Sequence, residues 1–275
     1  MNSAHLPIAL TIAGSDSGGG AGIQADLKTF HAFGVFGTSA ITAVTAQNTR
    51  GVSAIHPIPL EVVRAQIEAV AVDLPPAGVK TGMLATALLV REVAQAIRNH
   101  RLPNYVMDPV MVATSGDRLL DADAEAALVE DLLPLSTLVT PNLHEAGILT
   151  GAPVTTLEEM RTAARRLVEM GAGAALVKGG HLGKGEAVDL LWDGSREWSW
   201  SRLRMETLHT HGTGCTLSAA ATAGLARGLP LFEAVDHAVD FVARAISTAP
   251  GLGAGHGPVN HFAGTPYLPG LDLPF

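Results

Sequence analysis

The only cysteine of this 275-residue chain, Cys215, directly follows the triplet Gly212-Thr213-Gly214, where an apolar, alanine-rich helix is expected to begin. Free backbone N–H groups and the positive end of the helix dipole favour an anion at such a place. A thiol there is expected to have a lowered pKa, as reactive cysteines do. A lone cysteine is more often a small packed hydrophobe, and the residues alone leave that alternative open.

Two acids and an amide follow neighbouring predicted strands. Asp108 ends the run YVMDPV, and Asn142 and Glu145 come after the next strand in TPNLHEAGIL. Asn142 is expected to cap a short helix, with Glu145 at the third helical position. On one rim these three side chains could also hold a hydrated Mg²⁺. A purely structural cap is the alternative.

Two further polar residues stand at predicted strand ends. Gln47 ends an apolar run, and its amide offers a donor and an acceptor side by side, which suits the edge of an aminopyrimidine. Lys178 ends the run ALVK, where its ammonium could meet a phosphate. A surface glutamine and a snorkelling lysine are the structural alternatives.

The stretch AGSDSGGGAGIQADL lies between a predicted strand and a predicted helix. A dinucleotide-binding fingerprint requires an acidic residue at the end of the following strand, and Thr45-Ala46-Gln47 stands there instead. A P-loop is excluded because no Gly-Lys-Ser/Thr occurs. The glycines are therefore expected to allow close approach of the backbone to a ligand, with a simple tight turn as the alternative.

Apolar runs alternate with helical patterns along the chain and predict the elements that must position these residues. The predicted strands are residues 6–13, 38–45, 79–82, 105–110, 138–140 and 174–178, and the predicted helices are 22–33, 60–72, 85–97, 122–133, 157–170, 212–227 and 231–248. Asp193-Gly194 between alternating segments indicates a hairpin. This order predicts one α/β domain over residues 1–275, with a mostly parallel sheet covered on both faces. Its ligand site is expected outside the carboxyl ends of the strands.

Composition narrows the class of function. The chain is 47% hydrophobic with a formal net charge of −8, which argues against non-specific nucleic-acid binding. No apolar run reaches the length needed to cross a bilayer. A single cysteine excludes an internal disulfide, so we expect a cytoplasmic protein without a membrane or nucleic-acid partner.

The sequence resembles the hydroxymethylpyrimidine/phosphomethylpyrimidine kinases of thiamine biosynthesis, within the ribokinase-like superfamily. The resemblance extends over essentially the whole chain, in the motifs IAGSDSGGGAGIQADLKTF, VTAQNTRGV, KTGMLA, MDPVMVATSGDRLL, PNLHEA, VKGGHL, HTHGTGCTLSAA and GHGPVNH. It implies a three-layer α/β/α fold and a homodimer. It also implies Mg²⁺- and ATP-dependent phosphorylation of a hydroxymethyl pyrimidine and then of its monophosphate.

The resemblance also assigns roles to residues. Those implied for the pyrimidine pocket are Gly14, Asp26, Gln47, Met83 and Val110. Those implied for Mg²⁺ and the phosphates are Asp108, Asn142, Glu145 and Lys178, with Asp108 and Glu145 on the metal. Gly212, Thr213 and Gly214 would form the anion hole, and Cys215 stands where sugar kinases of the superfamily carry an aspartate base. A pyridoxal or pyridoxine kinase and a non-catalytic precursor-binding regulator are the competing functions.

Overall fold

The computed structural model describes residues 6–111, 120, 122–180 and 185–264. Within them, nine strands form one sheet in the order β3-β2-β1-β4-β5-β6-β7-β8-β9. The strands are β1 (Ile8–Asp16), β2 (Phe36–Asn48), β3 (Gly51–Pro57), β4 (Gly78–Thr81), β5 (Tyr105–Met107), β6 (Leu138–Val139), β7 (Ala175–Gly179), β8 (Glu186–Trp192) and β9 (Glu197–Leu203). The strands from β2 to β7 in this order pair in parallel, whereas β3, β8 and β9 are antiparallel to their neighbours.

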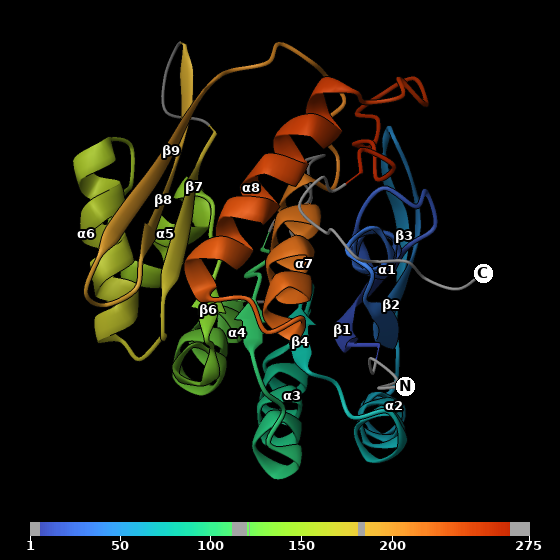
Figure 1. Cartoon of the computed structure of the whole chain (residues 1–275). Helices are drawn as coiled ribbons and strands as arrows, with labels where there is room; N and C mark the ends of the chain where they lie inside the picture. The colour runs from blue at the N-terminus through green and yellow to red at the C-terminus, as the bar shows by residue number, and fades with distance from the viewer. Residues whose placement is uncertain (1–5, 112–119, 121, 181–184, 265–275) are drawn as a thin grey trace, which may run out of the picture.

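Helices cover both faces of the sheet (Figure 1). They are α1 (Gly22–Ala32), α2 (Leu60–Asp73), α3 (Ala87–His100), α4 (Ala122–Ala127), α5 (Leu143–Thr150), α6 (Leu157–Glu169), α7 (Thr213–Ala226) and α8 (Leu231–Ser247). One apolar core lies against α1, α7 and α8, and the other lies against α2 to α6. The structure therefore has the predicted three-layer α/β/α arrangement.

The order in which strands join the sheet reverses at β1. From β1 the sheet grows outward through β2, and then the chain returns to place β4 on the other side of β1. Such a switch point leaves a crevice at the carboxyl ends of the strands, since the connections leave it on opposite faces. The crevice in this chain lies where β1, β4 and the start of α7 meet.

Most predicted elements are present, with some differences in extent. The hairpin at Asp193-Gly194 is confirmed: the Asp193 carboxylate accepts N–H groups of Ser195 and Arg196, and Gly194 has a φ of 91°. The strand β3 was not predicted, and it pairs with β2 as an exposed edge strand. The predicted helix 122–133 is wrong in its second half, where α4 passes into a π-helical turn, Leu128–Leu132, and then a short 3₁₀ turn, Leu133–Leu135.

Parts of two sequence motifs, residues 112–119 and 181–182, lie outside the described residues. Across the described ranges, none of the helices is both long and apolar enough to span a membrane.

Candidate functional site

A cavity of about 650 Å³ opens at the carboxyl ends of the parallel strands. One end is lined by the β1–α1 loop, by β2 and by the loops after β4 and β5. The other end is lined by α5, β7, the β8–β9 hairpin and α8, and the start of α7 lies between them. Of the thirteen residues singled out from the sequence, the cavity wall includes Gly14, Gln47, Met83, Asp108, Val110, Asn142, Glu145, Lys178, Gly212, Thr213, Gly214 and Cys215. Asp26 is the exception, and Lys80 is a lining residue that the sequence did not single out.

Asp16 shapes the glycine-rich β1–α1 loop at one end of the cavity. Its carboxylate accepts backbone N–H groups of Gly18, Gly20 and Ala21 at 2.8, 3.1 and 2.9 Å. Burial alone would raise the pKa of Asp16, but these bonds and the contact with His211 hold it below its ordinary value. The loop is therefore folded around an ionised carboxylate, and the glycines let the backbone wrap it.

The wall beside this loop is partly apolar. Met83 packs directly over Gly14, where a Cβ would lie 2.6 Å from the Met83 methyl carbon. Gln47 projects from β2, and its backbone is held by Ser17, whose hydroxyl bonds both the Gln47 N–H and carbonyl. Val110 completes the wall after β5. A flat ring with one polar edge fits a slot built from a methionine, a valine and a glutamine amide.

Asp26 lies behind the cavity, which corrects the expectation that it lines the pocket. It is fully buried, and its carboxylate accepts the Thr11 hydroxyl at 2.6 Å and contacts the Lys80 ammonium at 3.0 Å through both oxygens. Burial works against the charged ammonium, but the carboxylates of Asp26 and Asp108 outweigh it and raise the pKa of Lys80. Helix geometry explains the difference, because Asp26 faces the sheet from the second turn of α1.

The start of α7 adopts the turn that the glycines predicted. Gly212 is the N-cap with a φ of 81°, and it presses against the Gly20 carbonyl, so a side chain would strain the backbone and collide. Gly214 lies beside Lys178, and a Cβ on it would be 3.2 Å from the ammonium. These two positions leave the first-turn N–H groups and the Lys178 cation open to one anion.

The expected lowering of the Cys215 pKa is wrong for this chain. Burial raises the pKa of the thiol to about 11, and the carboxylates of Asp108 and Asp26 add to the effect, although Lys80 opposes it. The side chain is partly exposed to the cavity. The helix dipole is thus outweighed by desolvation and nearby negative charge, and the thiol is protonated at neutral pH.

At the other end, the predicted capping box is present. The Asn142 side chain accepts the Glu145 N–H at 2.9 Å, and the Glu145 carboxylate accepts the Asn142 N–H at 2.8 Å. Lys178 lies 3.4 Å from Asp108 and 4.0 Å from Glu145. Burial raises the pKa of Glu145 to about 7, with the Asp108 charge adding to the rise and Lys178 opposing it.

Asp108, Glu145 and Lys178 fit a site in which Mg²⁺ is bound by protein carboxylates together with substrate phosphates. Mg²⁺ keeps several waters and is commonly held by one or two carboxylates plus substrate phosphates. Asp108 and Glu145 supply two carboxylates, and Lys178 lies within 4.0 Å of both. Among the described residues there is no cluster of three His, Cys, Asp or Glu side chains that would form a complete protein-only site.

The β8–β9 hairpin and α8 line the far end of the cavity, which the sequence did not reveal. The hairpin contributes polar and apolar residues, and α8 contributes an apolar stripe of Val239, Val242, Ala243 and Ile246. Arg202 from the hairpin is held by Asp240 of α8 at 2.8 Å, which ties the two elements together. The helical spacing of the stripe was visible in the sequence, but its role depends on the hairpin beside it.

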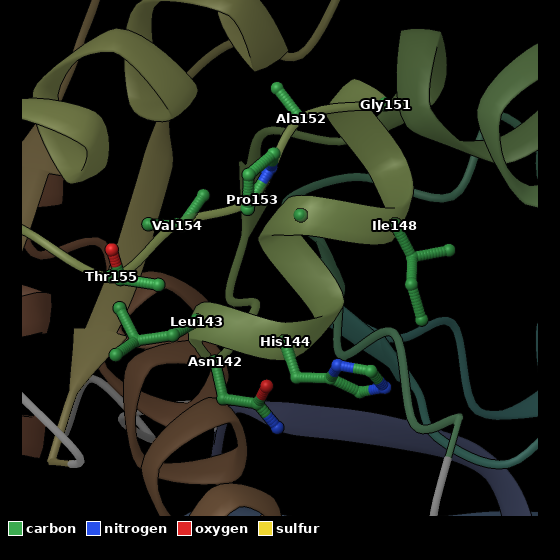
Figure 2. Close-up of a pocket in the computed structure, with 10 residues that line it drawn as sticks. Asn142, Leu143, His144, Ile148, Gly151, Ala152, Pro153, Val154 and Thr155 are labelled. Atoms are coloured by element: carbon green, nitrogen blue, oxygen red, sulfur yellow. The ribbon is translucent and has the colours of Figure 1, made fainter.

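A second cavity of about 640 Å³ borders α5 and the segment 151–155. Asn142 and His144 extend from the start of α5, away from Ala152 and Pro153 (Figure 2). The other lining residues are apolar or small, apart from Thr155. Asn142 lines both cavities, whereas Asp108, Glu145 and Lys178 line the first.

Comparison with known proteins gives consistent matches. Residues 16–260 match the sequence family described as phosphomethylpyrimidine kinase. A hydroxymethylpyrimidine/phosphomethylpyrimidine kinase of Rhizobium meliloti is 55% identical over 258 residues, covering 93% of this chain and 97% of that protein. A thiamine biosynthesis bifunctional protein of Geobacter sulfurreducens is 51% identical over 252 residues, covering 92% of this chain and 51% of that longer protein. The ADP complex of Bacillus subtilis pyridoxal kinase superposes with a TM-score of 0.88 at 40% identity, covering 94% of this chain and 98% of that one.

Proposed function

The chain belongs to the phosphomethylpyrimidine kinase family, and from that premise we propose that it phosphorylates 4-amino-5-hydroxymethyl-2-methylpyrimidine and then its monophosphate, using ATP, in thiamine biosynthesis. The observation that carries the proposal is one continuous cavity with a ring-sized polar slot at one end and a phosphate-binding cluster at the other. The start of α7 lies between the two ends, where a phosphoryl group would pass.

At the acceptor end, Gln47 reads the amino edge of the ring, while Met83, Val110 and the bare backbone of Gly14 contact its faces and rim. Asp26 acts from behind the wall through Lys80, which it holds at 3.0 Å. The hydroxymethyl group then points toward Cys215.

At the nucleotide end, the apolar stripe of α8 and the hairpin accommodate the base of ATP. Lys178 and the N–H groups of Gly212 to Gly214 hold the phosphates, with Asn142 beside them. Mg²⁺, held by Asp108 and Glu145, neutralises charge on the phosphates when it is bound. Phosphoryl transfer depends mainly on such positioning and charge stabilisation.

The two steps make different demands on Cys215. The hydroxymethyl group must lose a proton when its oxygen forms the new P–O bond, and the thiolate form of Cys215, the minor form at neutral pH, is placed to receive it. The monophosphate already carries a charge of roughly −1.5 to −2 near neutral pH and needs no base. Its difficulty is repulsion, which Lys178 and the start of α7 relieve.

We also propose that the protein acts in the cytoplasm as a homodimer of single-domain subunits. The free edge strand β3 and the adjacent β2 expose Phe36, Val44 and Ile55, a surface suited to a second copy. One sheet carries both ends of the cavity, which supports a single domain.

The test is phosphorus NMR of the enzyme with ATP and the pyrimidine alcohol. Successive mono- and diphosphate signals are expected, with ADP formed at each step. The alcohol of pyridoxine, supplied separately, tests the pyridoxal kinase alternative. Nucleotide binding without turnover of either alcohol would instead identify a regulator.

A further inference from the structure

The Asp16 carboxylate fixes which nitrogen of His211 carries a proton. Asp16 Oδ2 lies 2.9 Å from His211 Nε2, and the two side chains are buried. A carboxylate whose pKa is held low can only accept hydrogen bonds, so Nε2 must be the donor. His211 Nε2 therefore has no lone pair to offer to any other neighbour.

His211 Nε2 also lies near the side-chain amide of Gln47. Its Nε2 is placed 3.4 Å from His211 Nε2, and its Oε1 is placed 3.1 Å from Thr45 Oγ1. The first contact would set two donors against each other. The second competes with the 2.9 Å bond from the Thr45 hydroxyl to the Ser15 carbonyl, because a hydroxyl has only one proton.

Turning the terminal amide of Gln47 by 180° resolves both conflicts without moving any other atom. Its oxygen then becomes a second, weaker acceptor of the His211 Nε2–H, which it shares with Asp16 in a three-centre bond, and its nitrogen donates to Thr45, whose own proton stays on the Ser15 carbonyl. Oxygen and nitrogen of an amide occupy nearly the same volume, so the hydrogen-bond network decides between the two orientations.

We propose that His211, held by Asp16, and Thr45, held by the Ser15 carbonyl, are positioning residues that lock the Gln47 amide in this single orientation and so select a ring with an amino group next to a ring nitrogen. The amide keeps one N–H and one lone pair for the ligand. The free N–H, on the Thr45 side, meets the ring nitrogen, and the oxygen, on the His211 side, accepts from the amino group.

The lock rejects a ring with the reverse pattern. A 4-oxo pyrimidine presents an N–H and a carbonyl in place of the ring nitrogen and the amino group, so it requires the amide turned back. Turning the amide back breaks its bonds to His211 and Thr45. The inference rests on the proposed acceptor, and it adds the residues that decide between amino and oxo rings.

The surrounding backbone prevents His211 from turning away. Its N–H donates to the Gly257 carbonyl, and its own carbonyl accepts the Val259 N–H. Its ring lies so close to Gly20 that a Cβ there would be 2.5 Å from the imidazole Cδ2. The ring is thus held from both sides of the acceptor pocket.

The test compares dissociation constants of the 4-amino pyrimidine alcohol and its 4-oxo counterpart by titration calorimetry. Each hydrogen bond in the lock is expected to contribute roughly 3- to 10-fold to the preference for the amino ring. Thr45→Val and His211→Phe should each reduce that preference by such a factor, while Thr45→Ser should keep it. The matched control is Thr38→Val, which removes a hydroxyl bond to the Ala9 carbonyl on the same strand and should leave the preference unchanged.

Kinetics separate positioning from a general structural effect. In Thr45→Val the KM for the amino pyrimidine should rise, while the KM for ATP and kcat at saturation stay as in the native enzyme. The inference would be overturned if Thr45→Val and His211→Phe both kept the native preference for the amino ring. It would also be overturned if Thr38→Val lost as much of that preference as they did.

The native protein itself offers a test, in which a variant serves only to assign the signal. Nitrogen-15 NMR should show a proton on Nε2 of His211, with the signal identified by its loss in His211→Phe. A bare Nε2 would refute the lock. If the variants change the preference for the amino ring but no phosphorylation occurs, only the proposed function is refuted. If phosphorylation is normal but the variants leave the preference unaltered, only the lock is refuted.

Discussion

Two lysines flank Asp108, one in the half of the cavity that we propose holds the acceptor and one in the half that we propose holds the phosphates. Lys80 lies on the acceptor side, 3.8 Å from Asp108, with a side chain that is 0% exposed. Lys178 lies on the phosphate side, 3.4 Å from the other carboxylate oxygen, with a side chain that is 14% exposed. The same carboxylate therefore anchors one cation with no exposed surface and one that reaches into open space.

The difference shows that an ion pair near an active site does not by itself indicate a catalytic role. Lys80 is neutralised by Asp26, which is also fully buried, so its removal leaves uncompensated charge inside the protein. Lys178 is paired more loosely, and its ammonium is free to change partners when a phosphate arrives. We expect mutations on the first side to affect folding and mutations on the second to affect turnover.

Lys80→Met should have the largest effect. Breaking a buried pair by removing one partner typically costs about 3–5 kcal/mol of unfolding free energy, because the remaining charge is stranded. Denaturant unfolding measures this loss. The double variant Lys80→Met/Asp26→Leu should recover part of it.

The control for Lys80 is Arg64→Met, which breaks an exposed pair with Glu92. Surface pairs typically contribute 0 to about 1 kcal/mol. Equal losses in Lys80→Met and Arg64→Met would mean that burial of the acceptor-side pair does not matter, and the contrast between the two halves would fail.

Lys178→Ala should affect turnover more than stability, the reverse of what is expected for Lys80→Met. We expect kcat to fall by roughly 10²–10³-fold, the cost typical of removing one preorganised charge-stabilising group. The melting temperature should change little, and Lys178→Arg should retain part of the rate. Native turnover in Lys178→Ala, measured with a coupled ATPase assay, would make Lys178 a structural residue.

Cys215→Ala should separate the two phosphorylation steps. A positioned base typically contributes roughly 10²–10⁴-fold, and a thiol with a pKa of about 11 belongs at the lower end. The first step should therefore slow by about 10²-fold and the second much less. Asp is expected to restore activity better than Ser, since a serine hydroxyl is too weak an acid to supply an anion.

Single-turnover kinetics with each acceptor supplied separately distinguishes the outcomes for Cys215. Equal slowing of both steps would mean that the side chain shapes the anion hole. No slowing of either step would make it a small packed residue.

Glu145→Gln should have a smaller, pH-dependent effect on the stability of metal-free protein. The pKa of Glu145 is about 7 in the folded state and ordinarily near 4.3, so the folded state alone holds its proton between these values. The native chain should thus lose roughly 1–3 kcal/mol relative to Glu145→Gln as the pH rises through this window.

Denaturant unfolding at pH 5 and pH 8, with a chelator present, measures that change. Glu92→Gln is a control of opposite sign, because Arg64 lowers the pKa of Glu92, and the stability it contributes is lost only as the pH falls. A constant gap between native and Glu145→Gln protein would contradict the raised pKa.

Sequence spacing predicted the features that depend on residues close together in the chain. The spacing of Asn142 and Glu145 predicted the capping box, and Asp193-Gly194 predicted the hairpin. The three-layer fold followed from the alternation of strands and helices. The twelve cavity-lining residues were found from strand-end positions and from family resemblance.

Properties set by burial were not predictable in this way. The helix N-terminus suggested an acidic thiol at Cys215, but the folded chain buries the thiol and brings Asp108 and Asp26 near it, which reverses the effect. The family resemblance placed Asp26 in the pocket because its motif lines the pocket. Its position on α1 instead directs the side chain toward the sheet. The contact of His211 with Asp16 was not predictable, since the two residues are 195 positions apart.

That separation has a consequence for synthesis of the protein. The acceptor pocket joins the β1–α1 loop to the start of α7, through the His211–Asp16 contact and the packing of Gly212 on Gly20. A nascent chain that ends before His211 has the glycine loop and Gln47 but lacks His211 and Gly212, which pack against that loop in the finished protein. We therefore expect substrate to bind only after α7 has left the ribosome and docked, so that the pyrimidine stabilises finished molecules and prematurely terminated chains do not sequester it.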